Sequence, residues 1–290
     1  MPSYDELLEL LGTPPDEAQI QANRERAIAH ATRPWADRRG IESIDHNYRS
    51  LLVKASMDEL AEALEAVAIE TKQDVLGTEV EALGCFALVY QILGQAWSIF
   101  LSGELSPDGQ TTNCSRPDAA KLSQLIQQPV IAFNVSDTSS YIGYRLFEDG
   151  IVVESFSGTE GGFSPETVRK AQSDTKQQYY ELRPYQEEDP EASPQEAFFW
   201  SRDRQLTASE IGNIWHFPDQ FLCEQSAYEP VLDIHYFIDQ QSSYRGLQRG
   251  QRYSIQNPGT GFILGFNADG PEKIISIPEL VRVDYFRFGN

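Results

Sequence analysis

Cysteine is scarce in this sequence. The chain has 290 residues but only three cysteines, Cys85, Cys114 and Cys223, which are widely separated and form no C-x-x-C pair. An odd number of distant cysteines does not suit the disulfide framework of a small secreted domain. Cys85 opens an apolar run and is expected in the core, whereas Cys114 lies in a polar loop and is expected to be an exposed thiol. We therefore expect a reducing, cytoplasmic location.

Histidine is equally rare, and the motifs of common catalytic and metal sites are missing. The four histidines form no H-E-x-x-H or H-x-H pattern and no Cys/His cluster at ligand spacing. There is no G-x-S-x-G motif, and the glycines of 158–163 match no phosphate-binding loop. The sequence therefore predicts no metal and no cofactor, and an enzyme is the less favoured class.

Long apolar segments are also lacking. The most apolar run begins at Cys85, but polar residues and glycine interrupt it before it reaches the roughly 18 residues of a membrane helix. The first residues, MPSYDELLELLG, have neither the basic start nor the apolar stretch of a signal peptide. We expect no membrane insertion.

Basic residues are few. Lysine and arginine total 23 against 44 acidic residues, which gives a formal charge of −21. This charge repels phosphate backbones and anionic lipid, so no nucleic-acid partner is expected. A well-solvated surface explains such a charge without any partner. The alternatives are a partner with a basic surface, or mimicry of nucleic-acid charge.

What the sequence does contain is material for a core and an alternation of short elements. Hydrophobic residues make up 40% of the chain and aromatic residues 11%, which excludes global disorder. From residue 51 the patterns predict the order strand, helix, strand, strand, helix and then three strands. Hairpin signals such as Asp149–Gly150 connect the strands. We predict an α+β fold with a mainly antiparallel central sheet, helices packed on one face, and a helical N-terminal segment.

Composition shifts suggest four parts of the chain. Residues 1–50 are expected to form the helical N-terminal segment, and residues 51–183 the core α+β domain. The acidic, proline-containing stretch 184–197 is predicted to be a surface loop or linker. Residues 198–290 are predicted to form either a C-terminal α+β subdomain or an extension of the same sheet.

Two sets of residues are candidates for function. Asp233 and His235 lie two apart on a predicted strand, 231–238, and would point to the same side as an acid/base pair. The alternative is a half-buried pair with satisfied hydrogen bonds, because the sequence identifies no nucleophile beside them. Trp35 stands among basic residues and would suit partner binding if exposed; these residues are Arg33, Arg38 and Arg39. The alternative is that Trp35 packs the N-terminal segment onto the body and that the arginines pair internally.

The function that these observations favour is non-catalytic. We expect an acidic protein that binds a partner protein in a regulatory, assembly or immunity-type role, with contacts that are partly electrostatic. The partner would carry a basic surface. The alternative is an enzyme or a small-molecule sensor with a pocket between the central sheet and the C-terminal third.

Overall fold

The computed structural model describes residues 17–43, 47–104, 115–160, 177–182, 195–238, 250–267 and 270–289. The chain forms two compact units, and the first combines residues 1–34 with residues 259–278. Within it, helix α2 (Glu17–Ala31) contacts both strands of an antiparallel hairpin, β14 (Thr260–Asn267) and β15 (Gly270–Ser276). α2 lies within the predicted helical N-terminal segment, and the sequence also predicts a short helix at 4–11, which lies outside the described residues.

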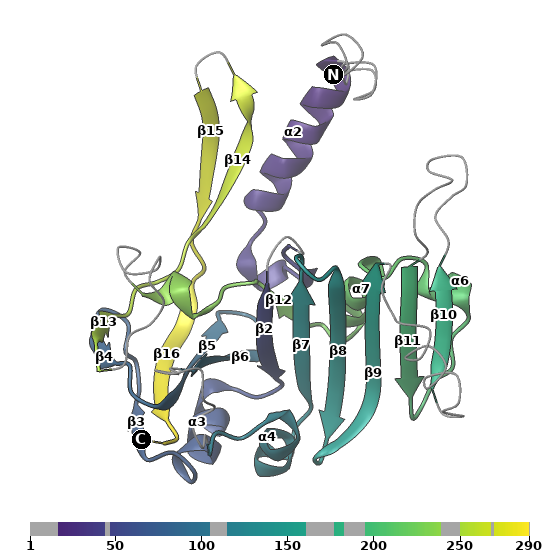
Figure 1. The fold of residues 1–290 in the computed structure, drawn as a ribbon. Coiled ribbons are helices and arrows are strands. Elements are labelled where there is room, and N and C mark those ends of the chain that lie inside the picture. Colours follow the sequence, from purple (N-terminus) through teal and green to yellow (C-terminus); the bar gives the residue numbers. More distant parts are fainter. Residues whose placement is uncertain are drawn as a thin grey trace, which may run out of the picture. The chain divides into compact units, whose positions relative to one another are not determined.

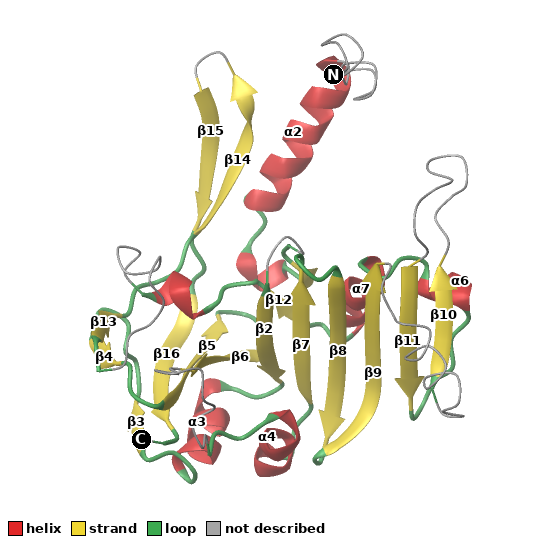
Figure 2. Ribbon diagram, viewed as in Figure 1, coloured by secondary structure: helices red, strands yellow, loops and turns green. Residues whose placement is uncertain are grey.

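The second unit, residues 35–258 and 279–290, contains a ten-stranded sheet in which every neighbouring pair is antiparallel (Figure 1). The strands in spatial order are β10 (Gln178–Leu182), β11 (Gln195–Ser201), β9 (Ile151–Glu160), β8 (Tyr141–Glu148), β7 (Val130–Ser136), β2 (Tyr48–Val53), β6 (Ser98–Glu104), β5 (Cys85–Ile92), β16 (Leu280–Arg287) and β3 (Glu70–Lys72). A few helices accompany the sheet (Figure 2). The predicted α+β class with an antiparallel sheet is confirmed.

Two short pairings lie outside the large sheet. β1 (Gly40–Ile41) runs parallel to β12 (Tyr228–Glu229), and β4 (Glu79–Glu81) runs antiparallel to β13 (Arg252–Ser254). The C-terminal strand β16 enters the large sheet beside β5. Residues near both ends of the second unit therefore contribute to one sheet.

One face of the sheet packs against α3 (Met57–Glu65) and α4 (Ala119–Ile126). The predicted capping box at the start of α3 is present, because Ser56 accepts from the backbone of Glu59 and the Glu59 carboxylate accepts from Ser56. Asp118 caps α4. The buried stripes of both helices meet apolar residues of β2, β5, β6, β7 and β16, and this core includes Leu60, Leu64, Leu122, Val53, Val89, Phe100, Val130 and Phe286.

The other face carries a second helical layer, so the expectation of helices on one face only is wrong. Two further helices, α6 (Ala208–Ile211) and α7 (His216–Glu224), belong to the core on this side. The Tyr144 ring lies parallel to the Phe221 ring, with 3.7 Å between their centroids. Pro218 is accommodated in α7 because the first turn of a helix has backbone N–H groups without intrahelical acceptors.

Two stretches differ from what their local sequence indicates. The glycine-rich sequence of 158–163 is typical of a loop, but β9 continues to Glu160 because β11 pairs with it, Gln195 opposite Glu160. The stretch 231–238 was expected to be a strand, but Ile234–Phe237 forms a 3-10 helix capped by Asp233. The sequence also predicts a helix at Ser164–Ser173, which lies outside the described residues, as does the stretch 184–194.

Cysteine bonding also departs from expectation. Cys85 is buried at the start of β5, as expected, but it is disulfide-bonded, whereas Cys223 on α7 is an exposed thiol. Cys114 lies outside the described residues, and the cytoplasmic location stays a prediction. None of the helices in the described part of the chain has both the length and the apolar character needed to cross a membrane.

The packing of α7 on the sheet generates a stability prediction. Phe221→Ala is expected to lower the free energy of unfolding by about 3–5 kcal/mol, because it removes a buried ring and leaves a cavity beneath Tyr144. Ile151→Ala, at an exposed hairpin position, is expected to change it by less than about 0.5 kcal/mol. Urea denaturation of both variants measures the difference. Equal effects would contradict the assignment of α7 to the core.

Candidate functional site

The structure does not place the side chains of Asp233 and His235 as a pair on a strand. Asp233 is the N-cap of the 3-10 helix, and its Oδ1 accepts the backbone N–H of His235 at 2.7 Å. Nδ1 of His235 is buried and makes no hydrogen bond with any described residue. The carboxylate therefore holds the backbone of the turn, and their role as an acid/base pair stays a prediction.

Trp35 lies in the interior and is not exposed as the partner-binding hypothesis required. It is 9% exposed, and the Arg38 guanidinium lies over its ring at 3.9 Å from the centroid. Arg38 is 1% exposed and forms an ion pair with Glu42 at 3.1 Å. Tyr228 packs edge-on against Trp35. The alternative that Trp35 serves packing is the one that its burial supports.

The other two arginines of this set remain at the surface. Arg33 is exposed and belongs to the first unit, whereas Trp35 opens the second. Arg39 donates from Nη1 to the backbone oxygens of Ala36 and Arg38, at 2.8 and 2.6 Å. Arg39 therefore holds the local backbone, and partner binding by these arginines stays a prediction.

A buried carboxyl group that the sequence did not single out lies under β2. Glu229 is 0% exposed, and it accepts hydrogen bonds from the Ser50 hydroxyl and from the backbone N–H of Val231, the latter at 3.2 Å. Val231 has a φ of 55°, which is costly for a β-branched residue, so Glu229 steadies a strained turn. Burial raises the pKa of Glu229 to about 7, against the lowering effect of these hydrogen bonds and of Tyr48.

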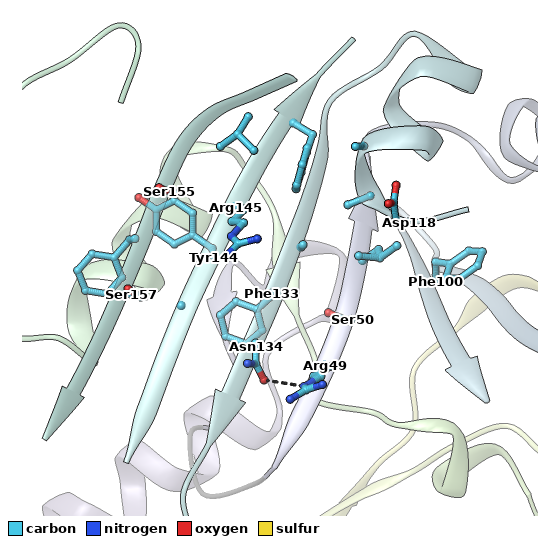
Figure 3. Close-up of a pocket in the computed structure, with 18 of the residues that line it drawn as sticks. Arg49, Ser50, Phe100, Asp118, Phe133, Asn134, Tyr144, Arg145, Ser155 and Ser157 are labelled. Atoms are coloured by element: carbon cyan, nitrogen blue, oxygen red, sulfur yellow. Dashed lines mark hydrogen bonds between the residues drawn. The ribbon is translucent and has the colours of Figure 1, made fainter. Parts of the chain in front are cut away.

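A wide groove lies on the sheet face that also carries α4. It has a volume of about 1050 Å³ and is bordered by β2, β6, β7, β8, β9 and β11 and by residues 116–120 (Figure 3). We call it the arginine groove, after Arg49, Arg116 and Arg145. A smaller cavity of about 510 Å³ shares Arg49, Asn134 and Tyr141 with it and includes Ser139.

Strand register explains how the groove is hollowed. In the ladder, Ala132 stands opposite Arg145, and Arg145 opposite Ser155. In the next row on the same face, Asn134 stands opposite Gly143, and Gly143 opposite Ser157. These small floor residues leave space between larger side chains, which include Phe100, Phe147, Phe198 and Trp200.

Polar groups from neighbouring strands meet over this floor. Nε of Arg49 donates to Oδ1 of Asn134 at 3.3 Å (Figure 3). A methyl group added at Gly143 would lie 2.6 Å from the Tyr141 hydroxyl, so the Tyr141 side chain leans over this glycine. Burial raises the pKa of Tyr141, and the guanidinium groups of Arg145 and Arg49 act in the opposite direction. Hydrogen-bond donors of neighbouring strands are therefore gathered in the groove.

The sequence carried only a weak signal for this groove. Arg145 follows Tyr144 in a strand of alternating character, and a charged residue on the second face of a central strand could have marked a solvent-facing surface. Arg49 and Arg116 lie far away in the sequence, and only the spatial order of the strands brings them to the same cavity. Nothing in the local sequence encodes that order.

Glu229 generates a pH prediction. Its folded pKa lies above the ordinary value of 4.5, so the folded state binds the proton more tightly than the unfolded state. The contribution is most favourable below about pH 4.5 and is lost as pH rises through about 7. Glu229→Gln removes the charge, so from acid to neutral pH the variant should gain up to about 3 kcal/mol relative to the parent. Urea denaturation across this range measures the gain, and a difference independent of pH would contradict the assignment.

Neither the described residues nor known proteins identify the site. Among described side chains, no group of three or more His, Cys, Asp or Glu is placed to hold a metal ion. No family model, no curated protein and no solved structure matches the chain. Functional inference therefore depends on the geometry and chemistry of the groove.

Proposed function

We propose that this protein is a non-catalytic binding protein that takes up a ligand in the arginine groove. The observation that carries the proposal is the convergence of donor side chains on a floor of small residues, beside an aromatic wall. Small-molecule sites occupy about 300–1,000 Å³ and combine apolar walls with a few placed polar groups, and the groove is of this size and character.

The lining favours binding over catalysis. General acid–base or nucleophilic catalysis uses a base within hydrogen-bond reach of the reacting proton. The groove lining that the structure describes has no histidine and no cysteine, and its carboxylate is Asp118. Oδ1 of Asp118 accepts the backbone N–H of Lys121 at 2.8 Å as a helix cap. The lining is therefore suited to holding a ligand.

For the small-molecule sensor alternative, the candidate pocket lies on a different face of the sheet from the one that the sequence suggested. The sequence suggested a pocket between the central sheet and the C-terminal third, but that layer is occupied by packed rings. Tyr144, Phe156 and Phe199 from the sheet contact Phe217 of α7, and Tyr144 also stacks on Phe221. The arginine groove lies on the opposite face of the sheet from these rings.

A protein partner with a basic surface is the second candidate, and one surface favours it. The outer side of α3 exposes four carboxylates within two turns, Asp58, Glu59, Glu62 and Glu65. They come from a chain of formal charge −21. A basic protein would be attracted to this side over a distance of about 10 Å at ordinary salt.

Ligand uptake in the groove is tested by blocking it. Ser155→Trp places a large ring on the groove floor, and Ser209→Trp makes the same change at an exposed position of α6. Thermal-shift screening of the parent with a metabolite library should find compounds that raise the melting temperature. Ser155→Trp should lose that increase, and Ser209→Trp should keep it. Retention of the increase in a folded Ser155→Trp variant would reject the groove as the site.

The basic-partner candidate has its own test. A fluorescent oligolysine peptide should bind the parent more weakly as ionic strength rises, because the attraction is screened. Glu62→Lys should weaken binding further, while Glu279→Lys, the same charge change at an exposed position just before β16, should have a smaller effect. Equal effects of the two variants would assign the attraction to net charge alone and remove α3 as a docking surface.

A further inference from the structure

We infer that the ligand of the arginine groove is a small organic anion, with a carboxylate or phosphate group held by Arg49 and Arg145 and an apolar body against Trp200 and Phe147. This inference rests on the proposed function and adds the chemical class of the ligand. Three observations carry it: the charge of the described groove lining, the lack of described carboxylate partners at Arg49 and Arg145, and the position of the neutral donors around them.

The described lining of the groove has a net positive charge, whereas the whole chain has a net negative charge. Among the described residues that line the groove, three are arginines and one is a carboxylate, whereas the whole chain has 44 acidic and 23 basic residues. Asp118 is the carboxylate, and its engagement at the start of α4 turns it toward the helix backbone. A local positive field inside an acidic protein attracts a compact anion at short range.

Arg49 and Arg145 lack the ion pairs that several other described arginines form. Five other described arginines form ion pairs, namely Arg38, Arg202, Arg204, Arg282 and Arg287. Arg49 and Arg145 are exposed, and neither forms an ion pair with a carboxylate of the described residues. Acidic residues outnumber basic ones almost twofold, so two guanidinium groups on one groove that lack a carboxylate partner among the described residues indicate a place for an external anion.

The neutral groups around these arginines suit the same ligand. Arg49 on β2 and Arg145 on β8 are separated by β7, so their backbones lie about 10 Å apart across the sheet. The Tyr141 side chain leans over Gly143, and the charges of both guanidinium groups act to lower the pKa of its hydroxyl. Ser155 and Ser157 add hydroxyls from β9 (Figure 3). Guanidinium and hydroxyl donors around one space match the acceptor oxygens of a carboxylate or phosphate.

Size and charge favour a small molecule over a polymer. The groove volume of about 1050 Å³ suits one small molecule. A nucleic acid would extend beyond the groove over a surface of formal charge −21, where its phosphates are repelled. Half-buried Trp200 and Phe147 offer apolar contact to the uncharged part of the ligand. An organic anion with a flat or apolar body uses both kinds of surface.

The test uses two aromatic dyes that differ in charge. Anilinonaphthalene sulfonate is an anion, and N-phenylnaphthylamine has the same aromatic system without the sulfonate. We expect the anionic dye to bind the parent protein at least about tenfold more tightly than the neutral dye, since a charge-assisted hydrogen bond contributes about 1.5–3 kcal/mol. Citrate and pyrophosphate should displace the anionic dye, and higher ionic strength should weaken it.

Charge variants assign the effect to the groove. Arg49→Gln and Arg145→Gln should each lower the affinity for the anionic dye about tenfold. Arg252→Gln makes the same charge change at an exposed residue of β13 and should leave its affinity unchanged. Melting temperatures of all three variants establish that they are folded, and Arg145→Lys should retain part of the binding because it keeps the charge.

The outcomes separate the inference from the proposed function. If Ser155→Trp abolishes binding of both dyes while Arg49→Gln and Arg145→Gln change neither, the groove binds ligands but the anionic class is wrong. If the anionic dye binds with equal affinity to the parent, Ser155→Trp and both arginine variants, the groove is not the site and both proposals fail. If both arginine variants lose binding of the anionic dye and keep binding of the neutral dye, the inference is supported.

Discussion

The stack of Tyr144 on Phe221 determines which side of the sheet is filled and which remains open. Side chains alternate along a strand, so fixing Tyr144 against α7 directs Arg145 to the other face. The buried Glu154 carboxylate strengthens this register, since it accepts the Tyr144 hydroxyl at 2.8 Å and pairs with Arg204 at 2.6 Å. A slip of one residue would bury Arg145 and expose Tyr144. The core and the groove therefore depend on the same register.

Ten strands in one sheet create two large faces, and the helices cover them unequally. α6, α7 and the 3-10 helix belong to the core on one face, and α3 and α4 cover part of the other. The remaining part of the second face carries small side chains at Ala132, Gly143 and Ser155, and here the sheet is hollowed. An architecture with a nearly continuous core on one side can leave the opposite side for binding without exposing that core.

Much of the fold could be predicted from the sequence, because strand and hairpin signals are local. Asp149–Gly150 marks the turn between β8 and β9, and the Ser56–Glu59 box starts α3. The strand prediction for 231–238 was wrong. The apolar residues alternate there as in a strand, but Asp233 caps a helical turn. The groove could not be predicted, because Arg49 and Arg145 meet only through the order of β2, β7 and β8, which tertiary pairing decides. The burial of Trp35 likewise depends on Tyr228, a distant residue in the chain.

The alternation of β7, β8 and β9 has a consequence for how this protein can diversify. Floor positions such as Ser155 and Ser157 face away from the rings that hold α7, so they line the groove and not the densely packed layer. Substitutions there would change the shape and the chemistry of the groove and leave the packed rings on the other face in place. A handful of exchanges on three adjacent strands would therefore give the groove a different lining without a new fold.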